Sequence, residues 1–129
     1  YKLETIEEAI KKKPKYVLFS AGSEVAKRFA EKFTKKGAVV IDNSSAFRMK
    51  KKHKLIVPEI NGNKITIKDR IIANPNCSTI QLVMSLFQIH KNIGIKRLVV
   101  STYQSVSGSG QKGLDQLQRE EKKEKVVNG

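Results

Sequence analysis

Residues 71–84 have the sequence IIANPNCSTIQLVM, which contains the clearest succession of elements in the chain. The apolar run Ile71-Ile72-Ala73 predicts a short buried strand, and the polar residues Asn74-Pro75-Asn76 predict a tight turn. Apolar residues then recur at i, i+3, i+4 and i+7 from Ile80, which is typical of a helix, and further apolar positions predict that this helix is largely buried. The stretch is therefore expected to run from strand through turn to helix.

The only cysteine of the chain, Cys77, stands where this helix is expected to begin. Backbone N–H groups at a helix start are unpaired, and the helix dipole favours negative charge there. Such a position stabilises a thiolate, which is the reactive form of cysteine. Asn76 or Ser78 is expected to cap the helix. The alternative is an inert buried cysteine, but the polar turn and the helix start favour a nucleophile.

The same alternation of strand, short turn and helix extends on both sides of this stretch. It is typical of a parallel sheet in an α/β protein. The continuous apolar run at 16–19 predicts a strand that is covered on both faces. Further strands are expected at 38–41, 55–57 and 96–103, a hairpin or turn at 65–67, and helices at 5–13 with Thr5 as cap, at 24–36, and from the glycine-rich turn at 107–110 to about residue 125.

Length and composition limit the class of protein. The 129 residues fit one domain or parts of two, and the absence of Met at Tyr1 predicts a fragment. A single cysteine excludes an internal disulfide and is compatible with a reducing cytoplasm, where we expect the protein to be located. No apolar run approaches the ~20 residues that span a bilayer, and no signal peptide opens the chain, so no membrane association is expected.

The net charge of +14 raises the alternative of a nucleic-acid-binding module, for which the basic run at 49–54 is the best support. The excess consists of 21 Lys and only 5 Arg, whereas arginine is preferred for bidentate recognition of phosphate and guanine. No aromatic residues interleave with the basic run to stack on bases. A solvated basic surface is therefore favoured, without a nucleic-acid partner.

Four turns of small or polar residues are expected at the carboxyl ends of strands, where parallel sheets bind their ligands. Three of them precede helix starts, which favour anions. These turns lie at residues 20–23, 42–48, 74–77 and 104–110.

Five ordered motifs resemble those of the aspartate-semialdehyde dehydrogenase family. The resemblance extends from about Tyr16 to Gly113 and implies a partial Rossmann-like parallel sheet, followed by the beginning of a second, α+β catalytic and dimerisation domain. The expected division lies between residues 76 and 77, so that 1–76 belong to the NADP-binding domain and 77–129 to the second domain. The motifs are FSAG at 19–22, DNSSAFR at 42–48, VPEIN at 57–61, NPNCSTIQ at 74–81, and STYQ at 101–104 with VSGSG at 106–110.

The resemblance implies roles for individual residues of the substrate site. Cys77 stands at the nucleophile that forms an acyl-thioester, and Gln104 at the glutamine that orients the acyl substrate. Arg48 stands at the arginine that holds phosphate, and Asn43 at an asparagine that lines the same site. The implied reaction interconverts aspartyl phosphate and aspartate semialdehyde, in the biosynthesis of lysine, threonine and methionine, by a homodimeric enzyme.

The resemblance also implies NADP as cofactor and no metal. Ser20, Ala21 and Gly22 match the turn beside the adenosine and ribose part of NADP. Ser107 and Gly108 match the turn beside its nicotinamide end. The Gly-rich dinucleotide loop of the family has no counterpart in the chain. The acid/base histidine of the family has none either, because neither His53 nor His90 fits that role. Both histidines are expected to face solvent. The fragment is therefore expected to be inactive alone.

Simpler structural readings of these residues stay open at this point. Arg48 alternatively forms a surface ion pair, and Asn43 alternatively serves only the turn. Gln104 alternatively caps the end of a strand, and residues 107–110 alternatively form a plain turn. Related acyl-phosphate reductases of the N-acetyl-glutamyl-phosphate or glyceraldehyde-phosphate type are the nearest alternative enzymes. The sequences NPNCST and TYQ favour the aspartate-semialdehyde family over these two.

Overall fold

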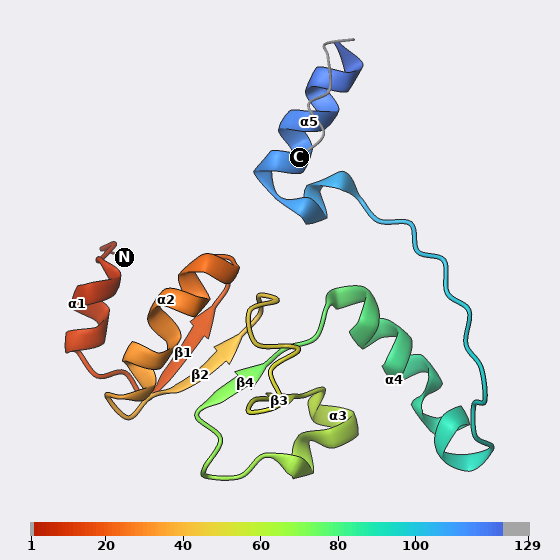
Figure 1. Ribbon diagram of the computed structural model, residues 1–129, viewed down its shortest axis with the longest axis horizontal. Helices are drawn as coiled ribbons and strands as arrows, with labels where there is room; N and C mark the ends of the chain where they lie inside the picture. Colours follow the sequence, from red (N-terminus) through yellow and green to blue (C-terminus); the bar gives the residue numbers. More distant parts are fainter. Residues whose placement is uncertain (1, 123–129) are drawn as a thin grey trace. The chain divides into compact units, whose positions relative to one another are not determined.

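The computed structural model describes residues 2–122 of the chain (Figure 1). It divides into two compact units, Tyr1–Ile95 and Lys96–Gly129. The first unit contains a sheet and its helices, and the second contains a short 3₁₀ helix and one α-helix.

A four-stranded sheet, parallel throughout, forms the centre of the first unit, as the alternation of elements predicted. Its strands are β1 (Tyr16–Phe19), β2 (Val39–Asp42), β3 (Lys54–Leu55) and β4 (Ile71–Ala73), in the order β1-β2-β4-β3. Val17 pairs with Val40, and Val40 pairs with Ile71, so alternate residues of three strands share one face. The α/β class is therefore confirmed.

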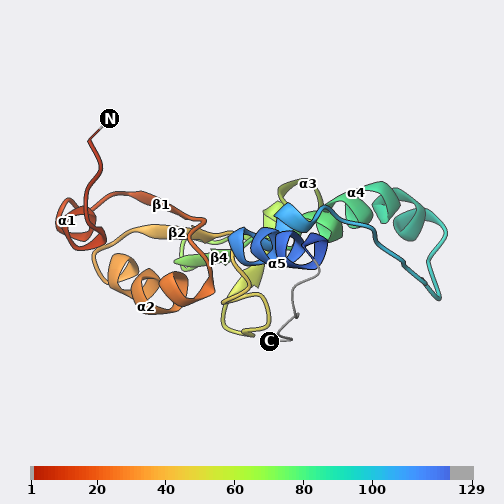
Figure 2. The ribbon, with the colours of Figure 1, turned by 90° about the horizontal axis from the view of Figure 1, so that it is seen from above.

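Helix α2 (Ser23–Thr34) packs against this shared face (Figures 1 and 2). Its apolar residues recur with helical spacing, so Phe29 and Phe33 point into the core and are 6% and 4% exposed. Phe33 meets Phe19 of β1 edge to face, with ring centroids 5.8 Å apart. The helix is followed by Gly37, whose φ of +95° is readily adopted by glycine.

The opposite face of β1 is open, which contradicts the expectation of a strand covered on both sides. Tyr16 and Leu18 point away from α2 and are 71% and 77% exposed. No described element of the first unit covers these two side chains, so the continuous apolar run does not produce two-sided burial here.

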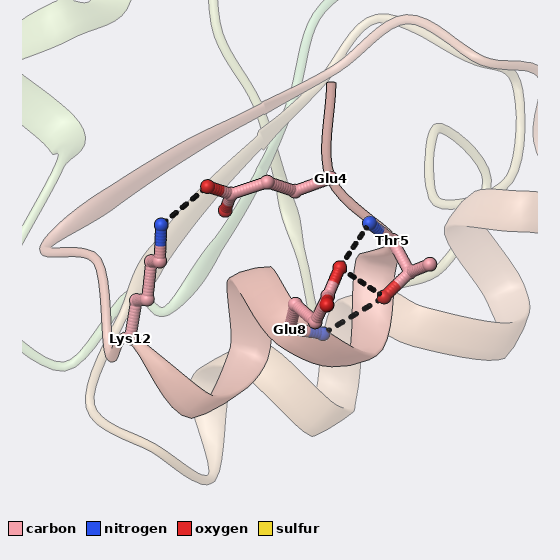
Figure 3. Close-up of polar contacts among 4 residues, drawn as sticks. All are labelled: Glu4, Thr5, Glu8 and Lys12. Carbon is pink, nitrogen blue, oxygen red and sulfur yellow. Dashed lines mark hydrogen bonds and ion pairs between the residues drawn. The ribbon is translucent and has the colours of Figure 1, made fainter. Parts of the chain in front are cut away.

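Helix α1 (Ile6–Lys11) begins with the cap that the sequence predicted (Figure 3). The Thr5 hydroxyl accepts a hydrogen bond from the Glu8 amide at 3.3 Å, and the Glu8 carboxylate accepts one from the Thr5 amide at 2.8 Å. The backbone hydrogen bond from Thr5 is the main reason why the pKa of Glu8 is lowered. Lys12 reaches back to pair with Glu4, which joins the two ends of the helix.

The segment between β3 and β4 contains α3 (Pro58–Asn61), the 3₁₀ helix η1 (Gly62–Lys64) and a turn, which is one of the two alternatives expected there. Asp69 holds this turn, because its carboxylate accepts hydrogen bonds from Lys54 Nζ at 2.7 Å and from the amide and hydroxyl of Thr66 at 2.7 and 2.8 Å. The bond from Lys54 is the largest cause of an Asp69 pKa lowered to about 2. Lys54 of the basic run therefore has a structural partner.

Helix α4 (Cys77–Asn92) follows β4 and contacts α3. Its position is confirmed, but the expectation that it is largely buried is wrong, because none of its residues is buried. Met84 and Ile89 are 45% and 47% exposed. The described elements supply too little contact surface to enclose all its apolar sides.

The second unit begins with residues 96–103, which were expected to form a strand. They are not in a strand, because no described strand pairs with them, and Val99 is 77% exposed. The 3₁₀ helix η2 (Val106–Ser109) and helix α5 (Gln111–Glu121) follow. The predicted end of this helix, near residue 125, lies outside the described residues. Among the residues that the structure describes, no helix is long and apolar enough to cross a membrane.

Candidate functional site

Three strands of the sheet end at one edge, and each leads into a turn that the sequence singled out. Because the strands are parallel, the turns after β1, β2 and β4 are neighbours. The backbone N–H of Asn43 donates to the Phe19 carbonyl at 2.9 Å, and the backbone N–H of Asn74 donates to the Asp42 carbonyl at 2.8 Å. These bonds continue the pairing of the strands into the turns and fix the turns relative to one another.

Asp42 anchors the loop that follows β2. Its side chain is fully buried, and its carboxylate accepts hydrogen bonds from the Ser44 amide at 3.1 Å and the Ser44 hydroxyl at 2.8 Å. The Ser44 hydroxyl in turn accepts from the Ala46 amide at 3.1 Å. Ala46 and Phe47 then enter the core, at 8% and 7% exposed. The residue after them, Arg48, therefore projects from a loop that is held at both ends.

Arg48 is half-buried and lies against the turns after β2 and β4. Its Nε donates to the Asn74 carbonyl at 2.9 Å, and its Nη2 donates to the Asn43 carbonyl at 2.9 Å. It makes no ion pair with any described residue, so the surface ion-pair alternative is not supported. Two of the five guanidinium N–H groups orient the side chain, and three make no hydrogen bond to the described part of the chain. A planar cation held in this way suits the oxygens of a phosphate.

Cys77 is the first residue of α4 and is exposed, so the alternative of a buried cysteine is wrong. Of the two expected caps, Asn76 caps the helix: its side-chain oxygen accepts from the Ser78 amide at 3.0 Å. The Cys77 thiol lies 3.9 Å from the same oxygen. The thiol therefore stands at a helix N-terminus, three residues after the carbonyl that Arg48 contacts.

The turn after β1 is exposed and leads directly into the start of α2. Ser20, Ala21 and Gly22 are exposed, and Gly22 has a φ of +87° with no atom within 4 Å of the place of a Cβ. Gly22 precedes α2 without a side-chain cap, which leaves backbone N–H groups at the helix start for an anion. The Ser23 and Ser45 hydroxyls lie 2.9 Å apart and join this turn to the loop of Arg48. A cavity of about 210 Å³, whose lining includes Ser20 and Ala21, opens beside β1.

Three further predicted site residues, Gln104, Ser107 and Gly108, belong to the second unit. Gln104 is exposed in the segment that precedes η2. The Ser107 hydroxyl lies 2.8 Å from that of Ser105, and the Gly108 amide donates to the Ser105 carbonyl at 3.0 Å. The first unit thus contains Cys77, Arg48, Asn43 and the turn after β1. The second unit contains Gln104, Ser107 and Gly108.

The two histidines differ in their surroundings. His53 was expected to face solvent, but it packs edge-on against Phe47, with ring centroids 5.0 Å apart, and is only partly exposed. Burial is the main reason why its pKa is lowered. His90 is exposed as expected, and its Nδ1 accepts a hydrogen bond from the Ile95 amide at 3.2 Å, near the C-terminus of α4.

Sequence reasoning gave no role to Asp42 or Asn74, which together hold the site. The sequence does contain one signal for Asp42, because Asp followed by Asn-Ser-Ser at a strand end is typical of a side-chain-stabilised turn. The contacts of Asn74 with residues 26 and 31 positions away have no local sequence signal.

Comparison with known proteins identifies the family of the chain. Residues 1–68 match the family model for the semialdehyde dehydrogenase NAD-binding domain, and residues 86–128 match that for the semialdehyde dehydrogenase dimerisation domain. The aspartate-semialdehyde dehydrogenase of Aquifex aeolicus is 54% identical over 107 residues, which are 81% of this chain and 32% of that protein. The chain therefore spans about a third of the length of this curated relative.

Solved structures give the same result. The crystal structure of aspartate semialdehyde dehydrogenase II from Vibrio cholerae superimposes with a TM-score of 0.74 at 42% identity, and covers 88% of this chain and 36% of its own. That of the Candida albicans enzyme with NADP superimposes with a TM-score of 0.51 at 25% identity, over 63% of this chain and 27% of its own. From its motifs, its parallel sheet and the match of residues 1–68, the chain belongs to the semialdehyde dehydrogenase family.

Proposed function

We propose that the protein is an NADP-dependent aspartate-semialdehyde dehydrogenase, which interconverts aspartyl phosphate and aspartate semialdehyde through a thioester on Cys77. The observation that carries the proposal is the pairing of an exposed thiol at a helix start with a guanidinium held at the same edge of the sheet. An acyl phosphate offers one group to each: its carbon to the thiolate and its phosphate to Arg48.

The chemistry divides a difficult reduction into two steps. The Cys77 thiolate attacks the acyl carbon, a C–S bond forms, and the bond from that carbon to the phosphate oxygen breaks. Arg48 binds the departing phosphate through its remaining N–H groups, with Asn43 lining the same site. Bound NADPH supplies the hydride that reduces the thioester carbon. The thiohemiacetal oxyanion on Cys77 then expels the thiolate and leaves the aldehyde.

Backbone N–H groups at the start of α4 are suited to stabilise negative charge on the carbonyl oxygen during both steps. They are fixed in direction by the Asn76 cap, so little reorganisation is needed when the charge develops. Loss of one such donor typically lowers the rate by ~10²–10³. Gln104 is proposed to orient the acyl group.

NADP is proposed to bind along the turns after β1 and before α5. Ser20, Ala21 and Gly22 would hold its adenosine and ribose part, and Ser107 and Gly108 its nicotinamide end. The exposed turn at the start of α2 supports the assignment of residues 20–22, as does the match of residues 1–68 to an NAD-binding domain. The assignment of Ser107 and Gly108 rests on the sequence resemblance. The choice of NADP is supported by the Candida albicans enzyme, whose crystal structure was solved with NADP.

The proposal includes a homodimer in the cytoplasm that serves lysine, threonine and methionine biosynthesis. The match of residues 86–128 to a dimerisation domain supports the dimer. The expected division between residues 76 and 77 lies between the two matched ranges and stays a prediction.

A substrate panel tests the proposal. The complete protein is assayed with aspartate semialdehyde, N-acetyl-glutamate semialdehyde and glyceraldehyde 3-phosphate, each with NADP or NAD and with or without inorganic phosphate. We expect phosphate-dependent reduction of NADP with aspartate semialdehyde. Oxidation of a different aldehyde alone would overturn the substrate assignment, and equal activity without phosphate would overturn the role of Arg48.

A binding titration tests the alternative of a nucleic-acid partner. Duplex and single-stranded DNA are titrated at rising salt, and we expect weak binding, since the basic run lacks aromatic residues and its Lys54 is paired with Asp69. Tight binding that weakens steeply with salt would revive the nucleic-acid module.

A further inference from the structure

Asn74 is the residue through which the loop of Arg48 and the start of α4 are joined. Its backbone amide donates to the Asp42 carbonyl at 2.8 Å, and its carbonyl accepts from Arg48 Nε at 2.9 Å. Its side-chain amide donates to Asn43 Oδ1 at 2.7 Å. Asn74 is half-buried, so these bonds are partly shielded from water.

The three residues form a closed set of hydrogen bonds. Arg48 donates to the carbonyls of both Asn74 and Asn43, and Asn74 donates to the side chain of Asn43. Each residue is thus held by the other two. In the bond between the two side chains Asn74 is the donor and Asn43 the acceptor, so alanine at either position removes it.

The connection from Asn74 to the thiol is short and stiff. Three residues of extended chain span at most roughly 11 Å, which limits the distance between Asn74 and Cys77. Pro75 is buried and has a fixed φ, and Asn76 is held as the cap of α4. Movement of Asn74 is therefore transmitted to the start of the helix.

We infer that Asn74 is a positioning residue, which holds the guanidinium of Arg48 against the start of α4 so that phosphate and the carbon attacked by Cys77 are bound at one fixed separation. This inference rests on the proposed function. It assigns to Asn74 no contact with the substrate: its effect passes through Arg48 and Asn43.

The test uses Asn74→Ala, Asn43→Ala and the double variant in the complete protein, with Asn63→Ala as control. Asn63 is an exposed asparagine in η1, outside this set of bonds. The measurements are the KM for phosphate and for NADP in the oxidative direction, the Kd of inorganic phosphate by titration calorimetry, and the melting temperature.

We expect Asn74→Ala to raise both the KM and the Kd for phosphate about threefold to tenfold, the effect of one lost hydrogen bond, and to leave the KM for NADP within about twofold. In the Asn43→Ala background the same change is expected to add less than about twofold, because the shared bond is already lost. Asn63→Ala is expected to match the wild type. If Asn74→Ala does not fold, Asn74→Ser, which keeps a small polar side chain without the reach to Asn43, is measured in the same way.

Three results would overturn the inference: phosphate constants that do not change, an equal rise in the KM for NADP, or effects of the two variants that simply add. The calorimetric Kd needs no turnover, so it separates this inference from the proposed function. If the Kd of phosphate changes among the variants as predicted but the wild type oxidises no aspartate semialdehyde, the result would contradict the proposed function alone.

Discussion

Replacing Asp42 by alanine is expected to lower the free energy of unfolding by about 2 kcal/mol and to loosen the loop that carries Arg48. The carboxylate accepts two hydrogen bonds from Ser44, at 3.1 and 2.8 Å, and its side chain is fully buried. Hydrogen bonds to charged groups contribute about 1.5–3 kcal/mol each, and removal of the buried carboxylate also relieves a desolvation cost. The two bonds together contribute about 3–6 kcal/mol, and the relieved desolvation cost lowers the expected net loss to about 2 kcal/mol.

Urea unfolding followed by circular dichroism measures this change. With a slope of about 2 kcal/mol/M, the midpoint is expected to fall by about 1 M. Asp42→Asn keeps the size of the side chain and one acceptor oxygen, so its midpoint is expected to lie between those of Asp42→Ala and the wild type. Asp115→Ala is the matched control, because that exposed aspartate accepts one hydrogen bond from Gln111 on the surface of α5 and its loss is expected to cost less than about 0.5 kcal/mol.

The Asp42 variants also have an expected effect on the site. Since Ser44 and Ala46 are held through this carboxylate, Asp42→Ala is expected to raise the KM for phosphate more than the KM for NADP. A midpoint for Asp42→Ala that coincides with that of the Asp115→Ala control would refute the reasoning about the anchored loop.

Two further predictions concern stability. Thr5→Ala removes the hydroxyl of the capping box of α1 and is expected to lower the free energy of unfolding by about 1 kcal/mol in the same urea experiment; an unchanged midpoint would show that α1 does not depend on its cap. Asp69 has a pKa lowered to about 2 by its bonds to Lys54 and Thr66, so its contribution to stability is fully present above its ordinary pKa of 3.8 and is lost as the pH falls toward 2. The difference in midpoint between the wild type and Asp69→Asn should therefore be largest above pH 4 and should shrink toward pH 2, and a difference that grows on acidification would contradict the assignment.

The local elements of the fold could be predicted from the sequence because their signals are local. The apolar spacing of Phe29 and Phe33 determined the inner face of α2, and Thr5 with Glu8 determined the start of α1. Burial and strand pairing depend on other parts of the chain, so they could not be predicted in the same way. The open face of β1, the exposed sides of α4 and the unpaired residues 96–103 are all of this kind.

The candidate site shows the same division. Cys77, Arg48 and Asn43 lie at the turns that the sequence indicated, because a strand followed by a polar turn is visible in the order of residues. The bonds that hold them run through Asn74, which contacts residues 26 and 31 positions away. No periodicity or spacing reports such partners, so only the folded arrangement of β2 and β4 identifies them.

The role of Cys77 is tested most directly by trapping the covalent intermediate. The complete protein and its Cys77→Ser variant are incubated with aspartate semialdehyde and NADP in the absence of phosphate, quenched in acid, and analysed by intact mass spectrometry, with NADP affinity measured in parallel. We predict an acyl adduct on Cys77 in the wild type, none in the variant, a fall in turnover of at least about a thousandfold, and an NADP affinity within about twofold of the wild type. Near-normal turnover by the variant, or an adduct on another residue, would contradict the account.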